Sequence, residues 1–60
     1  MTLAELKIEA KNRGIYIGKL TVNKDSQGEY DVMMDGRNIA STYATSAMEA
    51  KIEAVEYLIR

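Results

Sequence analysis

The sequence predicts an α+β domain with the element order α-β-β-β-α, a three-stranded antiparallel sheet with two helices packed on one face. Three observations support this fold class. Apolar residues recur at helical spacing near both ends of the chain, the middle of the chain alternates between apolar and polar residues, and short turn-forming stretches separate the alternating segments. Sixty residues are enough for one small domain, so residues 1–60 are expected to form a single domain.

The first helix is expected to begin at Thr2. Thr2 and Glu5 have the spacing of a capping box, in which each side chain bonds a backbone N–H of the first turn. The helix should end at 12–14, where Gly14 suits the left-handed position after a helix. The apolar positions of this helix are Leu3, Leu6 and Ala10, with Ala4 and Ile8 beside them.

The first strand is predicted over 15–23, with Leu20 and Val22 on its inner face. Gly18 is interpreted as a bulge, because the alternation of apolar residues changes phase there. The stretch 24–28 is rich in turn-forming residues and is expected to be a hairpin loop.

The second strand, 29–34, alternates cleanly, and Asp35-Gly36 favours a two-residue type I′ turn into a third strand over 37–44. The small residues of the third strand would let a helix lie close to the sheet. The residues expected to face the helices are therefore Ala40, Thr42 and Ala44, and those expected to point away are Ile39, Ser41 and Tyr43.

A long second helix is expected from Ser46, which forms another capping-box pattern with Glu49. Its apolar residues fall in two neighbouring rows, and an acidic stripe lies opposite. The first row is Ala47, Ala50, Ala54 and Leu58, the second is Met48, Ile52, Val55 and Ile59, and the stripe is Glu49, Glu53, Glu56 and Arg60.

The composition argues against an enzyme. The chain has no His and no Cys, so its hydroxyl groups lack an imidazole base, and neither imidazole nor thiolate ligands are present. The acidic stripe is interpreted as a solvated helix face rather than a cation site. No catalytic residue, cofactor, metal or small-molecule substrate is therefore predicted. Because no stretch has the pattern of a membrane span or signal peptide, a cytoplasmic protein is expected.

The charges are unevenly distributed, although the net charge is only −1. Residues 1–24 contain five basic and two acidic residues, whereas residues 25–60 contain three basic and seven acidic residues. Proteins that bind polyanions usually carry a dense basic face. The modest basic excess of the first part is more simply interpreted as scattered surface charge.

The chain resembles the double-stranded RNA-binding domain along essentially its whole length. The resemblance lies in the element order, in Arg13-Gly14 after the first helix, in Tyr30-x-Val32-x-Met34, and in Ser46-x-x-x-Ala50-Lys51-x-x-Ala54. It implies two helices on one face of the sheet. In members of this family that bind RNA, it also implies contacts with A-form RNA at three places.

All three RNA-contact places depart from the family's pattern. Ala47 and Met48 occupy leading basic positions of the second helix, where only Lys51 remains. Ile8 stands where the first helix usually carries a polar residue, and the loop 24–28 has neither Pro nor His. Because phosphate contacts supply much of the affinity for nucleic acids, the sequence argues for the fold and against ordinary RNA binding.

Two functions are therefore considered. The favoured one is a protein-interaction module, an accessory or inhibitor protein of bacterial or phage type, which binds a partner protein or a second copy of itself. Its candidate interface residues are Met33, Ile39, Tyr43, Met48, Ile52 and Tyr57. Two points stay open: the first helix could cover the second apolar row instead of a second copy, and Tyr57 suits either the core edge or an exposed anchor.

The alternative is nucleic-acid binding through the basic first helix and first strand. It requires the basic side chains to gather on one face. The residues considered for it are Lys7, Lys11, Arg13, Lys19, Lys24 and Lys51. Neither hypothesis involves a membrane or a cofactor.

Overall fold

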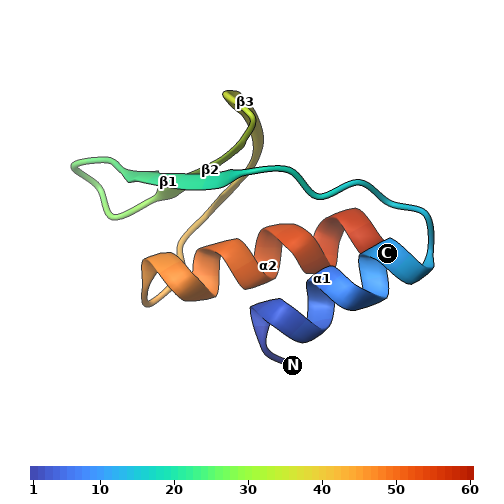
Figure 1. Cartoon of the computed structure of the whole chain (residues 1–60). Coiled ribbons are helices and arrows are strands. Elements are labelled where there is room, and N and C mark those ends of the chain that lie inside the picture. Colours follow the sequence, from blue (N-terminus) through green and yellow to red (C-terminus); the bar gives the residue numbers. More distant parts are fainter.

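The computed structural model describes residues 1–60 and confirms the predicted order of elements. Both helices lie on the same side of a twisted three-stranded sheet, and they run side by side beneath it (Figure 1). The elements are α1 (Leu3–Asn12), β1 (Leu20–Lys24), β2 (Tyr30–Met34), β3 (Arg37–Thr42) and α2 (Ala47–Ile59).

The sheet is an antiparallel meander with the spatial order β1-β2-β3, so β1 and β3 are its two edges. In the register, Val22 lies opposite Val32, and Val32 lies opposite Ala40. The turn between β2 and β3 has positive φ at both central residues, 53° at Asp35 and 84° at Gly36, as the predicted type I′ turn requires.

The core consists of two small clusters that meet along α2. One cluster lies between the helices and contains Leu6, Ala10, Val55 and Ile59. The other lies between α2 and the sheet and contains Val32, Ala50 and Ala54. Alanine at both helix positions of the second cluster lets α2 approach β2 closely, as the small residues of the sequence predict. The second apolar row of α2 therefore faces α1.

The capping box predicted for α1 is complete, whereas the one predicted for α2 forms only in part. Thr2 accepts a hydrogen bond from the Glu5 backbone N–H at 3.2 Å, and the Thr2 N–H donates to the Glu5 carboxylate at 2.9 Å. Ser46 likewise accepts from the Glu49 N–H at 3.1 Å. In a complete capping box, the Glu49 carboxylate would accept a hydrogen bond from the Ser46 backbone N–H. Here it accepts one from the Thr45 hydroxyl instead.

Helix α1 ends at the predicted glycine. Gly14 has φ 74°, its N–H donates to the carbonyl of Lys11 at 3.0 Å, and the N–H of Ile15 donates to the carbonyl of Ala10 at 2.8 Å. These two bonds are those of a Schellman motif, which satisfies the last helical carbonyls and turns the chain towards the sheet.

The first strand is shorter than predicted, because residues 15–19 do not pair with β2. The Asp35 turn binds this segment instead: the Asp35 N–H donates to the Lys19 carbonyl at 2.9 Å, and the Lys19 N–H donates to the Asp35 carboxylate at 3.0 Å. Ile15 and Ile17 pack against the cluster between the helices. Gly18 is therefore not a bulge. It leaves room for Asp35, because a Cβ there would lie within 2.7 Å of all three carboxyl atoms.

Asp35 also accepts a hydrogen bond from the Tyr16 hydroxyl at 2.9 Å. This bond, together with the negative charge of Asp35, raises the pKa of the Tyr16 phenol. A pKa that is higher in the folded than in the unfolded state stabilises the fold below the unfolded value, about 10. That contribution is lost as the pH rises through the folded pKa.

We therefore expect Tyr16 to ionise at higher pH than an unperturbed tyrosine. Spectrophotometric titration of the four tyrosines would measure this, with Tyr16→Phe used to assign the signal. Asp35→Asn should lower the pKa of Tyr16 towards its ordinary value, because the charge on the acceptor is removed. An unchanged Tyr16 titration in Asp35→Asn would contradict this explanation.

The bulge of this sheet lies in β3 rather than at Gly18. Val32 pairs with Ala40 and Met33 pairs with Asn38, so Ile39 is an extra residue without a partner. As a result, Ile39 and Ala40 both pack against the cluster beneath the sheet. The expectation that Ile39 points away from the helices is therefore wrong, because the bulge shifts the alternation by one residue.

The other expected orientations in this part of the chain are confirmed. Ala40 and Ala44 pack against the cluster beneath the sheet, and Thr42 bonds to α2. Ser41 and Tyr43 are exposed. Neither helix has the length and apolar character that crossing a bilayer requires.

Candidate functional site

The outer edge of β3 is unpaired, because β3 has β2 on one side and no strand on the other. Alternate residues of such an edge direct their backbone N–H and C=O groups away from the sheet. These groups are a template for pairing with another extended chain. The outer edge of β3 therefore offers backbone hydrogen-bonding groups that no other strand of the sheet uses.

A groove runs between this edge and α2. Figure 1 shows why it opens: the twist of the sheet brings the end of β3 close to the start of α2 and leads the start of β3 away from the helix. The groove has a volume of about 510 Å3. Its lining residues are Ile39, Ala40, Ser41, Thr42, Glu53, Ala54, Glu56, Tyr57 and Arg60.

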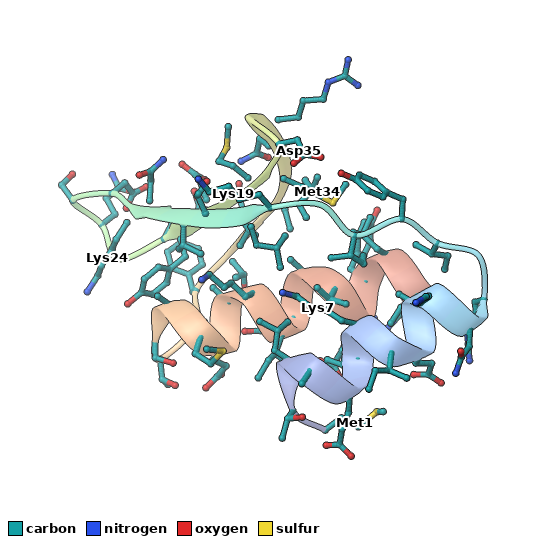
Figure 2. The ribbon with its side chains drawn as sticks, in the orientation of Figure 1. Met1, Lys7, Lys19, Lys24, Met34 and Asp35 are labelled. Atoms are coloured by element: carbon teal, nitrogen blue, oxygen red, sulfur yellow. The ribbon has the colours of Figure 1, made fainter.

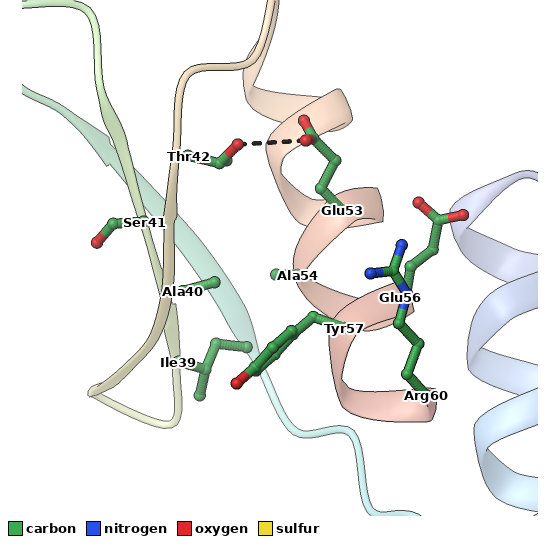
Figure 3. A pocket seen from close by; sticks show the side chains of 9 residues that line it. All are labelled: Ile39, Ala40, Ser41, Thr42, Glu53, Ala54, Glu56, Tyr57 and Arg60. Atoms are coloured by element: carbon green, nitrogen blue, oxygen red, sulfur yellow. Dashed lines mark hydrogen bonds between the residues drawn. The ribbon is translucent and has the colours of Figure 1, made fainter.

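Small residues form the floor of the groove and a tyrosine forms one wall. Ala54 is only 1% exposed, and Ala40 opposite it is half-buried, so neither fills the space between strand and helix. Tyr57 extends from α2 towards Ile39 (Figure 3) and remains 65% exposed. A tyrosine this exposed beside an isoleucine provides a flat apolar surface with a polar end.

Charged side chains lie along the helix side of the groove. The Thr42 hydroxyl donates to the Glu53 carboxylate at 3.2 Å, which joins β3 to α2 at one end (Figure 3). The Arg60 side chain folds back along α2, and its guanidinium lies beside Glu56 (Figure 3). The molecule has one ion pair, between Glu9 and Arg13, so Glu53, Glu56 and Arg60 have no ionic partner.

The candidate interface residues Met33, Ile39 and Tyr43 do not form an apolar patch on the open face of the sheet. Met33 lies on that face, but its neighbours across the strands are the polar residues Thr21 and Asn38. Ile39 packs beneath the sheet because of the bulge. Tyr43 is 70% exposed and follows the end of β3. The open face is therefore mainly polar, and the Ser41 hydroxyl donates to Asp31 on it at 2.8 Å.

The second apolar row of α2 is mostly covered by α1. Val55 and Ile59 are buried in the cluster between the helices, and Ile52 packs against the same cluster. Only Met48, in the first turn of α2, stays exposed, at 54%. Of the two alternatives that the sequence left open, the structure therefore shows coverage by the first helix.

The six basic candidates occupy several parts of the molecule. Lys7 belongs to α1, Lys19 lies just before β1, and Lys24 ends β1 at the hairpin loop (Figure 2). The Lys24 ammonium lies 5.6 Å from the centre of the Tyr30 ring. Arg13 is held by Glu9 at 3.3 Å and by the Ile59 carbonyl at 3.0 Å.

One pair of lysines is brought together. Lys7 and Lys11 lie one turn apart on α1 and line a second depression of about 430 Å3 with Gly14 and residues 15–17. Lys51 is half-buried on α2. The depression contains two positive charges and the exposed Tyr16 ring. This basic surface is smaller than the one that all six basic candidates would form on a single face.

Sequence reasoning identified Tyr57 as an interface candidate but did not find the groove around it. Glu53, Glu56 and Arg60 are in the predicted polar stripe, but nothing in the stripe indicates that β3 lies beside it. The small residues Ala40 and Ala54 were the available signal, since they predict a close approach of strand and helix. No group of three acidic side chains is arranged to hold a metal ion.

No protein-family model matches the chain, and no curated protein or solved structure matches it either. The resemblance to the double-stranded RNA-binding domain thus remains an expectation from the sequence. The function has to be inferred from the geometry of the groove.

Proposed function

We propose that this protein is a non-enzymatic protein-interaction module that binds an extended segment of a partner protein in the groove between β3 and α2. The observation that carries the proposal is the position of an unpaired strand edge beside a groove of about 510 Å3. In strand addition, backbone hydrogen bonds to a free edge supply affinity and side-chain pockets beside it supply specificity. Both features are present in this groove.

The size of the groove suits a short segment rather than a folded domain. β3 has six residues, so an added strand would pair with a partner segment of similar length. Tyr57 is the expected anchor, because tyrosines with exposed apolar surface often contribute most to the affinity of an interface. An accessory or inhibitor protein could act in this way, by occupying a segment of its partner.

To test the proposal, eight-residue peptides would be selected from a displayed library, and their affinities measured by fluorescence anisotropy. We expect the Tyr57→Ala substitution to lower the affinity for the selected peptides by about tenfold or more, which is the loss typical of an aromatic anchor. Tyr43→Ala is the matched control: Tyr43 is 70% exposed, does not line the groove, and should leave affinity unchanged. Amide chemical shifts should change along β3 and the facing side of α2.

Two results would overturn the proposal. One is equal binding by the Tyr57→Ala and Tyr43→Ala variants. The other is a set of shift changes confined to α1 and residues 15–17, which would place the ligand in the second depression.

Nucleic-acid binding is the second candidate, and the Lys7–Lys11 pair beside Tyr16 favours it. Duplex RNA and duplex DNA would be titrated at low and high salt. Binding that weakens with rising salt and is lost in Lys7→Glu/Lys11→Glu would support this candidate instead, because phosphate contacts release counterions. Two lysines on one helix face would give only a shallow dependence on salt.

A further inference from the structure

The free edge of the sheet has opposite charges at the two ends of β3. Thr42, at the end of the strand, donates to Glu53 of α2, and Glu53 has no ionic partner. Arg37, at the start, is exposed, also has no ionic partner, and pairs with Met34 of β2. Met34 lies two residues from the buried Val32, so Met34 and Arg37 lie on the helix side of the sheet. The edge is therefore basic at its start and acidic at its end.

A strand that pairs antiparallel with β3 meets these charges in reverse order. Its N-terminal end lies beside Thr42 and Glu53, where a basic residue is favourable. Residues nearer its middle lie beside Tyr57, whose ring extends towards Ile39 and suits an apolar neighbour (Figure 3). β3 itself has this pattern, because it begins with Arg37 and continues to Ile39 two residues later. The strand therefore complements its own edge.

The free backbone groups of two β3 strands also match. In an antiparallel ladder, pairs that exchange both backbone bonds alternate with pairs that exchange none. The Met34–Arg37 pair closes the two-residue turn and is a bonded pair, so Asn38 directs its groups away from β2. Asp31 lies three residues before Met34, so its pair with Ser41 is a non-bonded one. Asn38 and Ser41 therefore both offer their backbone groups to another strand.

On the basis of the proposed strand addition, we propose that the extended segment is β3 of a second copy of this chain. The protein is then a two-fold symmetric dimer in which the two sheets join at β3. Asn38 of each copy lies opposite Ser41 of the other, so that free backbone groups meet free backbone groups. Arg37 then falls opposite Thr42 and pairs with Glu53 of the other copy, once at each end of the interface. Only one strand of the second copy enters each site, as the length of β3 requires.

The helices leave room for this arrangement. The two-fold axis is perpendicular to the joined sheet, so both α2 helices stay on one face. Each α2 packs beneath β2 through Val32, and the two β2 strands are three strand spacings apart, about 14 Å. Helices in direct contact lie about 8–10 Å apart, so the space between the two α2 helices holds side chains. Tyr57 of each copy fills this space beside Ala40 of the other, which buries a ring that is 65% exposed in one copy.

Exchanging the charges tests the pairing. Sedimentation equilibrium would measure the dissociation constant of the wild-type dimer and of two single variants, Arg37→Glu and Glu53→Arg. Each variant should dimerise about tenfold or more weakly, because exposed ion pairs contribute modestly but both pairs become repulsive. An equimolar mixture of the two variants should recover the wild-type affinity as a heterodimer, since opposite charges then face each other at both ends.

Lys7→Glu is the matched control for net charge. It changes the charge by the same amount as Arg37→Glu, but Lys7 lies on α1 and should leave the dissociation constant unchanged. Hydrogen exchange locates the interface: the amides of Asn38 and Ser41 should exchange more slowly as the protein concentration rises. Peptides selected for the groove should convert the dimer to monomer, because they compete for the same edge.

The possible outcomes separate this inference from the strand addition on which it rests. A protein that stays monomeric up to about 1 mM, while selected peptides shift the β3 amides, would overturn the dimer and leave strand addition standing. A dimer that the mixture of variants does not restore, or that leaves the exchange of the β3 amides unchanged, would also overturn the inference. If neither a second copy nor any peptide binds along β3, both proposals are wrong.

Discussion

The Leu6→Ala variant is expected to lose a large part of the protein's free energy of unfolding. Leu6 is 2% exposed and belongs to the cluster that joins α1 to α2. Replacing a buried leucine by alanine usually costs about 2–5 kcal/mol. A chain of this length has a total stability of only about 3–9 kcal/mol. Urea unfolding followed by far-UV circular dichroism would measure the change.

Ile8→Ala is the matched control for this prediction. Ile8 lies on the same helix, but it is 61% exposed. Its replacement should change the free energy of unfolding by no more than about 0.5 kcal/mol. A loss of stability in Ile8→Ala equal to that in Leu6→Ala would contradict the explanation, because alanine is a better helix former than either residue and only Leu6 is buried against α2.

The Gly18→Ala variant is expected to lose about 1–3 kcal/mol, the range typical of an added methyl group in a tight site. The added Cβ would overlap the Asp35 carboxyl group. That carboxylate accepts bonds from Tyr16 and from the Lys19 N–H, so it cannot move without losing them. Gly18 is not among the glycines with positive φ, and the steric overlap alone accounts for the cost.

Thermal unfolding of Gly18→Ala would be measured in the wild-type protein and in the Asp35→Gly variant, to test whether overlap with the Asp35 side chain causes the loss of stability. With Asp35→Gly already present, the alanine should cost far less, because its neighbour has no side chain. The pKa of Tyr16 offers a second measurement, since displacing Asp35 should lower it. An equal cost of Gly18→Ala in both backgrounds would contradict the explanation.

Together these predictions describe a fold with little excess stability. The three-stranded sheet is covered by helices on one face only, and its open face is mainly polar. Most of the apolar surface of α2 is used to bind α1 and the sheet. The groove is therefore the surface where backbone groups, an aromatic side chain and unpaired charges come together.

Much of the fold could be predicted from local sequence, because its determinants lie close together in the chain. The Thr2–Glu5 box, the glycine after α1 and the Asp35-Gly36 turn each depend on a few consecutive residues. The apolar rows of α2 predicted its two buried faces. The element order was predicted in this way and is confirmed.

The site could be predicted only in part, because it depends on contacts between residues far apart in the chain. The bulge at Ile39 arises from pairing with β2, and the Asp35 carboxylate replaces sheet pairing near Gly18. The groove exists because a twisted edge strand diverges from a straight helix. By itself, the sequence determined the helices, the turns and which side chains are apolar. Only the tertiary structure decided that Tyr57 and Glu53 face a free strand edge, since no local pattern specifies how far a sheet twists away from the helix beneath it.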